Sequence, residues 1–339
     1  MKHSVVKFAA VLLCFSFYSC KKNVSEASFY YWKTKFKISQ TEKSALQQLN
    51  VNSLYVRFFD VDLEKESGKP IPVGVIEGLD SVPPNTKIIP VVFITNRTFL
   101  NLSKEEVLLL AKNVVSKINS IKKDCNELQF DCDWSGKTKT NYFLFLEEVK
   151  KLLSKNTALT CTIRLHQVKY ALRSGIPPVD RGILMFYNIG DLYDQNEANS
   201  IYNSQNAKKY ITFIKDYKLP LDVALPVFRW FVHYRNNTVV GLITKDNMPK
   251  TNDTLYFSQL ENNTKFNVRT DHLENGIFYR TNDVLKLETL NDEQLIEAAE
   301  LVNENLKKED RKIIFYDLDE DNIKYYDKKT FTKIMAVFN

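Results

Sequence analysis

From about residue 28 onward, short β-rich runs alternate with longer amphipathic runs, and this alternation leaves few folds open to the chain. Eight runs are rich in Val, Ile, Phe and Tyr and have the length of a strand. They cover residues 28–32, 53–59, 87–95, 127–133, 158–165, 182–187, 222–227 and 312–316. Strands that alternate with helices form parallel sheets, and eight is the number that closes a barrel. We therefore predict an α/β fold, the (β/α)8 TIM barrel.

Most of the predicted strands are followed by a run with helical periodicity. The helical runs are 41–49, 103–121, 140–153, 207–217 and 292–307. Ser103 and Glu106 stand three residues apart at the start of the second of these runs, which is the pattern of a capping box. A doubly wound open sheet, the main alternative, requires a glycine-rich first strand–helix turn that this sequence lacks.

One segment does not fit the alternation. Between the seventh and eighth predicted strands the chain is polar, rich in Asn and too long for a simple connection. We predict a small insertion of strands and turns at about 231–286, within a barrel domain that covers 24–339. The net charge of +6 is not concentrated in a basic block with interleaved aromatics, so no nucleic-acid partner is expected, and we expect a monomer.

The N-terminus has the composition of a targeting signal. Lys2 and Lys7 precede or flank an apolar run at 8–17, which is too short to cross a bilayer and typical of a secretory signal. Cys20 follows Ser19 directly, as in a bacterial lipobox. We therefore predict cleavage before Cys20, its lipidation, and an exported protein anchored in the cell envelope, on the outer membrane or the periplasmic face. The alternative is a plain signal peptide, 1–20, in which Cys20 is incidental.

The sharpest local pattern is LQFDCDWS at 128–135. In a strand, Gln129, Asp131, Asp133 and Ser135 lie on one face and the residues between them on the other. Two carboxylates inside a barrel are costly unless they are hydrogen-bonded or take part in chemistry, and their mutual repulsion raises one pKa. A carboxyl with a raised pKa can act as a proton donor near neutral pH, and Asp133 would stand at the carboxyl-end rim where barrel active sites lie. The plain alternative is that both aspartates end the strand and cap the next loop.

This run resembles the strand-four signature D-x-x-D-x-D-x-E of the family 18, chitinase-type, glycoside hydrolases. Other segments follow in family order: the aromatic 28–32 and 54–62, then MFYN at 185–188, ALPVF at 224–228 and IFYDLD at 314–319, which are similar to M-x-Y-D, G-x-P-x-Y and the final strand. The resemblance covers residues 28 to about 320. The chain is also similar to an uncharacterised bacterial barrel family whose fourth strand has the same D-x-D followed by Ser.

The resemblance implies roles for individual residues. Asp133 would orient and polarise the acetamido group of the substrate, with Asp131 behind it. Tyr187 would hydrogen-bond near the reacting carbon, Asn188 takes the place of an Asp, and Tyr316 stands where a Trp usually forms the floor of the sugar site.

The sequence also departs from the family. Leu128 replaces the first aspartate of the signature, Ser135 stands at the position of the acid Glu, and the S-x-G-G of strand three is missing from 91–96. A serine cannot protonate a glycosidic oxygen, and loss of a general acid costs roughly 10²–10⁴-fold in rate.

Two functions remain open. The first, which we favour, is a glycoside hydrolase that uses Asp133 as its acid together with a second rim carboxylate, because glycosidases need two carboxyls. The second is a glycan-binding protein that keeps the aromatic platform without turnover. We expect neither metal nor cofactor, because no set of His, Cys and carboxylate residues has ligand spacing.

Further residues are candidates for substrate binding. Arg57 and Arg229, with Arg164, lie in or just after strands, where buried arginines must be paired, so they either bind the aspartates, which we favour, or hold an anionic sugar. For the aromatic residues Trp32, Trp134, Trp230 and Tyr316 we favour a packing role. Trp230 and Tyr316, near strand ends, are the best candidates among them for stacking on a sugar ring. His166 is either a rim base or sugar ligand or a plain surface histidine, and Gln129 shares the face of the aspartates.

Overall fold

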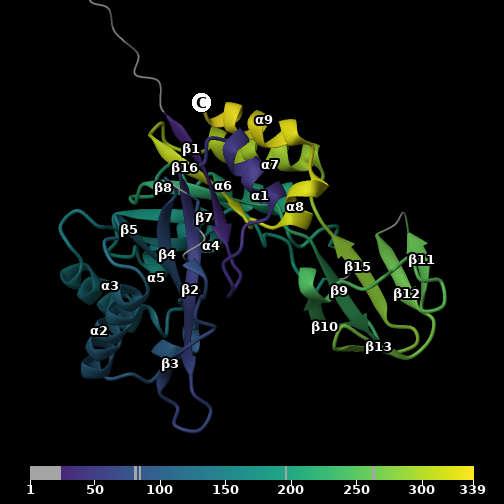
Figure 1. The fold of residues 1–339 in the computed structure, drawn as a ribbon, viewed down its shortest axis with the longest axis horizontal. Coiled ribbons are helices and arrows are strands. Elements are labelled where there is room, and N and C mark those ends of the chain that lie inside the picture. The colour runs from purple at the N-terminus through teal and green to yellow at the C-terminus, as the bar shows by residue number, and fades with distance from the viewer. Residues whose placement is uncertain (1–23, 80–81, 84, 195–196, 262–263) are drawn as a thin grey trace, which may run out of the picture.

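Eight parallel strands form a closed barrel in the computed structural model, which describes residues 24–79, 82–83, 85–194, 197–261 and 264–339. Each strand pairs with the next, and β1 pairs with both β2 and the last strand, which closes the ring (Figure 1). The barrel strands are β1 (Ser25–Tyr31), β2 (Ser53–Leu63), β4 (Lys87–Ile94), β5 (Glu127–Asp131), β6 (Ala158–Arg164), β7 (Arg181–Met185), β8 (Leu221–Pro226) and β16 (Arg311–Tyr316). The predicted (β/α)8 barrel is confirmed.

Helices cover the outside of the ring (Figure 1). They are α1 (Gln40–Gln48), α2 (Lys104–Ile121), α3 (Lys139–Leu152), α4 (Leu165–Lys169), α5 (Ala171–Ser174), α6 (Ser204–Ile211), α7 (Asp292–Glu304), α8 (Glu320–Tyr325) and α9 (Lys328–Phe338). The capping box predicted for α2 is present, with the Ser103 side chain accepting from the Glu106 N–H and the Glu106 side chain accepting from the Ser103 N–H. A short strand that the sequence did not predict, β3 (Pro70–Val73), pairs antiparallel with the end of β2.

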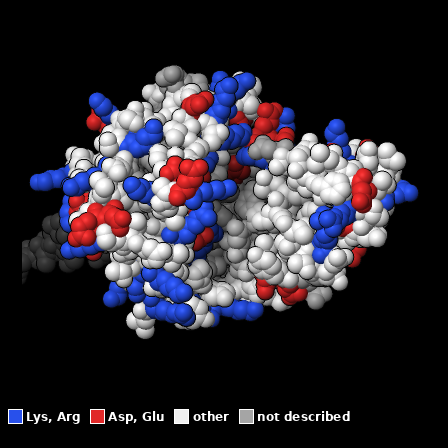
Figure 2. All heavy atoms as spheres, turned by 90° about the horizontal axis from the view of Figure 1, so that it is seen from below, with Lys and Arg blue, Asp and Glu red and all other residues white. Residues whose placement is uncertain are grey.

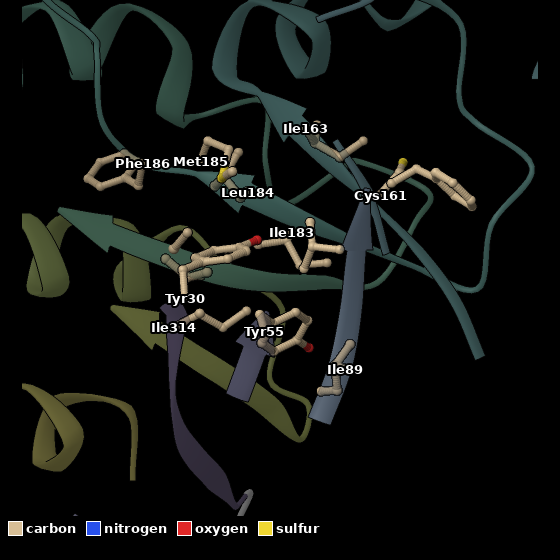
Figure 3. Close-up of a cluster of buried hydrophobic side chains, with 14 of the residues drawn as sticks. Tyr30, Tyr55, Ile89, Cys161, Ile163, Ile183, Leu184, Met185, Phe186 and Ile314 are labelled. Carbon is tan, nitrogen blue, oxygen red and sulfur yellow. The ribbon is translucent and has the colours of Figure 1, made fainter. Parts of the chain in front are cut away.

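The barrel interior is filled by side chains from alternate positions of the strands. Tyr30, Tyr55, Ile183 and Ile314 point toward one another inside the ring (Figure 3). Below them, Glu127 accepts a hydrogen bond of 2.8 Å from the Tyr55 hydroxyl and forms an ion pair with Lys312. Buried polar groups need such partners, and this network closes the amino-end half of the barrel.

Residues of the other face pack on the helices. The Phe130 ring meets Phe145 of α3 edge to face at 5.0 Å, and Trp134 stacks on Tyr142 at 5.4 Å. Cys132 and Cys161 are buried free thiols on this face. The alternation expected for β5 therefore holds: Asp131 points inward and its neighbours point outward.

The insertion between β8 and β16 is an antiparallel β unit with a hydrophobic cluster of its own, formed around Phe231, Phe257 and Leu285 (Figure 1). Its strands are β9 (Trp230–Arg235), β10 (Thr238–Ile243), β11 (Phe257–Glu261), β12 (Lys265–Val268), β13 (His272–Glu274), β14 (Ile277–Tyr279) and β15 (Val284–Glu288), and the 3-10 turn η3 (Lys245–Asn247) follows β10. Trp230 pairs with Glu288, so the chain leaves the barrel and returns to it at one point.

The predicted signal sequence and Cys20 lie outside the described residues. Within the described part of the chain, no helix is both long and apolar enough to cross a membrane. The same residues contain no group of three His, Cys, Asp or Glu side chains that could hold a metal ion.

Candidate functional site

A cavity of about 350 Å³ lies at the carboxyl-end mouth of the barrel, beside the insertion. This face of the molecule is hollowed between the two parts of the chain (Figure 2). The lining residues come from the ends of β1, β5, β6, β7, β8 and β16, from the insertion and from α8: Trp32, Asp131, Arg164, Met185, Tyr187, Asn188, Phe228, Arg229, Trp230, Thr244, Lys245, Tyr316, Asp317 and Asn322.

Aromatic rings form a continuous wall of this cavity. Tyr187 stacks on Tyr316 with ring centroids 5.5 Å apart, and Trp32 lies 5.6 Å from Tyr316 on another side. Phe228 bridges Tyr316, at 5.7 Å, and Trp230, at 5.1 Å. Burial raises the pKa of Tyr187 and of Tyr316, so both phenols keep their protons and can donate hydrogen bonds.

Asp131 is a buried acidic group in the wall of the cavity, with 7% of the residue exposed. It accepts a hydrogen bond of 2.7 Å from the Thr162 hydroxyl. Its pKa is raised to about 6, mainly by burial; Arg164 opposes the rise and the nearby Asp133 adds to it. The sequence predicted one raised pKa in this pair, with repulsion as the reason, whereas desolvation is the larger cause.

Asp133 lies at the outer rim and its side chain is 55% exposed. Both of its oxygens are held by Arg164, at 2.7 Å from Nε and 3.2 Å from Nη2. Burial alone would lower the pKa of Arg164, but Asp133 raises it above the ordinary value. The Asp133 carboxylate is therefore engaged in a two-pronged ion pair with Arg164.

Four other carboxylates around the mouth are also bound to cations. The pairs are Arg57 with Asp60, Arg97 with Asp62, Lys245 with Asp317 at 2.7 Å, and Lys33 with Asp319 at 2.9 Å. Among these described rim carboxylates and the strand-four pair, Asp131 alone has no cation at salt-bridge distance.

Ser135, at the position of the family's acid, lies outside the cavity. Strand β5 ends at Asp131, so the two-residue alternation stops before Ser135, which is exposed on the following loop. Its backbone N–H donates to the Thr138 hydroxyl at 2.9 Å, and its own hydroxyl lies 3.3 Å from the same oxygen.

Most of the residues predicted as a site meet at this cavity. Asp131, Tyr187, Asn188, Trp230, Tyr316 and Arg229 all line it. Asn188 has a φ of 54°, a left-handed conformation that Asn tolerates better than most residues, and its N–H donates to the Ile201 carbonyl at 2.7 Å.

Four predicted residues do not line the cavity. Asp133 is exposed and paired with Arg164 at the outer rim. Gln129 is fully buried in the barrel interior, where its amide donates to the Tyr30 hydroxyl at 2.7 Å. The Arg57 guanidinium forms an ion pair with Asp60, to which its Nε donates at 2.6 Å. His166 is an exposed residue of α4.

The sequence missed several lining residues, notably Trp32, Phe228, Thr244, Lys245 and Asn322. Trp32 directly follows β1, so its position at the rim could have been predicted from the sequence. Lys245 comes from the insertion, and its approach to Asp317 depends on how the insertion folds back.

A buried network fixes Trp230 in the cavity wall. Glu288 accepts hydrogen bonds from the Trp230 indole at 3.0 Å, from the Ser200 N–H at 3.1 Å and from the Ser200 hydroxyl. Its other oxygen binds Lys286 Nζ at 2.7 Å.

Comparison with known proteins agrees with this architecture. No protein-family model and no curated sequence matches the chain. Several solved structures match it in fold. The spore cortex-lytic enzyme SleL of Bacillus cereus matches with 14% identity over 94% of this chain and 75% of its own (TM-score 0.54). A chitinase from Bacteroides thetaiotaomicron matches with 12% identity over 93% and 96% (TM-score 0.55), and chitinase RmChi1 of Rhizomucor miehei with 10% identity over 93% and 100% (TM-score 0.53). The chain therefore has a divergent barrel of the chitinase type, the glycoside hydrolase-like fold that the sequence predicted.

Proposed function

We propose that this protein binds a glycan in the cavity at the barrel mouth and does not cleave it by the mechanism of the family it resembles. The observation that carries the proposal is the aromatic wall of Trp32, Tyr316, Phe228 and Trp230 beside hydrogen-bonding groups. A sugar ring presents apolar C–H faces and a polar rim of hydroxyls, and a cavity of this kind complements both. Proteins with the same fold include chitinases.

Binding is favoured over cleavage by the state of the acidic groups. The position of the family's acid holds an exposed serine, and the Asp133 carboxylate is engaged by Arg164. Glycosidases need a protonated carboxyl on one side of the scissile bond and a second carboxyl placed opposite it. Asp317, the other carboxylate that lines the cavity, forms an ion pair with Lys245.

One observation favours hydrolysis as the second candidate. Asp131 lines the cavity and has a pKa of about 6, so part of the population carries a proton near neutral pH. A carboxyl of this kind has the proton affinity of a general acid. In this scheme Asp131, and not Asp133, donates the proton.

Calorimetric binding and product analysis on the same oligosaccharides separate the two functions. The full chain, purified in a detergent without a sugar headgroup, is titrated with chitin, cellulose, xylan, mannan and acidic oligosaccharides. We expect saturable binding that Trp230→Ala weakens tenfold or more, in the range of about 2 kcal/mol for a hot-spot Trp. Tyr193→Ala removes an exposed ring outside the cavity and should leave binding unchanged.

Product formation that Asp131→Asn abolishes would replace the binding proposal by the hydrolase. Binding by none of the oligosaccharides, or binding that is indifferent to Trp230→Ala, would reject a glycan site in this cavity.

The proposal extends to the place of the protein in the cell. The signal-like N-terminus and the lipobox-like Cys20 support export and a lipid anchor in the cell envelope. Cells fed a radiolabelled fatty acid should label the wild-type protein and not the Cys20→Ala variant. A labelled Cys20→Ala protein, or an unlabelled wild type, would refute the anchor.

A further inference from the structure

Three cationic side chains line the cavity, and two of them are neutralised. Arg164 is paired with Asp133 at 2.7 Å, and Lys245 with Asp317 at 2.7 Å. The third is Arg229. Among the described residues, no carboxylate lies within salt-bridge distance of Arg229 and no hydrogen-bond acceptor is bound by it, so this lining residue carries a charge without a counter-ion.

The Arg229 guanidinium is in contact with an aromatic ring, and this contact takes up none of its hydrogen-bond donors. The guanidinium carbon lies 5.3 Å from the centroid of the Tyr325 ring. A contact with a ring face stabilises the cation and leaves the N–H groups of the guanidinium available in its plane. Arg229 is half-buried and stands between Phe228 and Trp230, all three of which line the cavity.

On the basis of the proposed function, we infer that the glycan is acidic and that Arg229 binds its anionic group, a carboxylate or a sulfate ester, beside the sugar that contacts Trp230. A guanidinium presents paired donors in a fixed fork that matches the two oxygens of such a group. A half-buried cation without a counter-ion is costly, and an anionic ligand removes this cost on binding. Neutral chitin-type oligosaccharides lack the group.

The inference is tested with pairs of oligosaccharides in which one member carries anionic groups and the other carries none. Tetragalacturonate is compared with its fully methyl-esterified form, and a hyaluronan tetrasaccharide with chitotetraose, by calorimetry on the full chain in sugar-free detergent. A sulfated carrageenan tetrasaccharide distinguishes a sulfate ester from a carboxylate as the anionic group. We expect the acidic member of at least one comparison to bind at least tenfold more tightly, and the preference to shrink as NaCl is raised from about 50 to 500 mM.

Variants of Arg229 locate the effect. Arg229→Gln should remove most of the preference for the acidic member, about ten- to hundredfold, the range for hydrogen bonds to a charged group, and weaken binding of the neutral member far less. Arg229→Lys keeps the charge without the fork and should fall between the two. Arg173→Gln removes the same charge from an exposed residue of α5 and is the matched control. Urea unfolding of each variant verifies that it is folded.

Two outcomes overturn the inference, and a third also rejects the function beneath it. A wild type that binds neutral and acidic members equally overturns the acidic ligand and leaves the glycan site intact. A preference for acidic members that Arg229→Gln does not reduce overturns the role of Arg229. No binding by any member rejects the glycan site together with the inference.

Discussion

The Asp131 carboxyl makes the stability of this protein sensitive to pH. Its pKa is raised from 3.8 to about 6 because the group is buried, so the folded chain holds this proton more tightly than the unfolded chain. A group of this kind favours the folded state at low pH, and its contribution is lost as the pH rises through the pKa of the folded state. For Asp131 the loss falls between about pH 4 and pH 6.

Asp131→Asn should therefore raise the free energy of unfolding at pH 7.5. The amide is uncharged at every pH and can still accept from Thr162. A shift of about two pK units corresponds to at most about 3 kcal/mol, and we expect about 1–3 kcal/mol at pH 7.5 and little change near pH 4. Urea unfolding at both pH values measures the difference, with Asp133→Asn, whose side chain is exposed and ion-paired, as the control that should not stabilise. A less stable Asp131→Asn protein at pH 7.5 would contradict the burial account.

The capping box at the start of α2 gives a prediction about a single helix. Ser103 satisfies the Glu106 N–H, and Ser103→Ala leaves this donor without its partner. We expect a loss of about 1 kcal/mol in the free energy of unfolding. Ser116→Ala, on the exposed face of the same helix, should be neutral or slightly stabilising, because Ala has the higher helix propensity. Equal effects of the two substitutions in urea unfolding would argue against the cap.

The junction of β9 and β15 ties the cavity wall to the barrel through Glu288. Glu288→Ala removes the acceptor of the Trp230 indole and leaves the buried Lys286 without its carboxylate. We expect a loss of about 3–5 kcal/mol in stability, the usual effect of breaking a buried ion pair, together with weaker glycan binding.

The double variant Lys286→Met with Glu288→Ala separates the two roles of Glu288. Removing both charges should restore much of the stability, because no unpaired buried charge remains. Glycan affinity, measured by calorimetry, should stay low, because the Trp230 indole still has no acceptor. Full recovery of affinity in the double variant would show that Glu288 does not position Trp230.

The strands were predictable from the sequence, and their ends were not. Each strand is marked by a dense run of Val, Ile, Phe and Tyr, which burial on both faces of a barrel strand requires. Strand β2 runs on to Leu63 because β3 pairs with Asp60–Leu63, a contact without local signal. Strand β5 stops at Asp131, two residues earlier than predicted, and this places Ser135 on an exposed loop. The pairing of Asp133 with Arg164 followed from the adjacency of strands four and five.

At the scale of the whole molecule, the site residues that the barrel contributes can be predicted from the sequence. Those that the insertion contributes cannot. Tyr187 and Tyr316 belong to strand-end motifs, so their meeting at the mouth follows from parallel strands alone. Thr244 and Lys245 reach the cavity because Trp230 pairs with Glu288, and the intervening segment folds back over the rim. Such a return depends on long-range packing of the insertion, for which periodicity carries no information.

This division predicts that the insertion can be removed without unfolding the barrel. The hydrophobic cluster of the insertion is separate from the barrel core, and the pairing of Trp230 with Glu288 holds the two cut ends side by side. Replacing 231–287 by a short Gly-Ser turn, with Glu288→Gln so that no buried charge is left without Lys286, should therefore leave one cooperative urea transition and the far-ultraviolet circular dichroism of a barrel. Glycan affinity should fall tenfold or more, because Thr244 and Lys245 are lost and Asp317 loses its cation. If the shortened chain fails to fold, the barrel and the insertion form one cooperative unit; if it folds and binds with unchanged affinity, the insertion takes no part in the site.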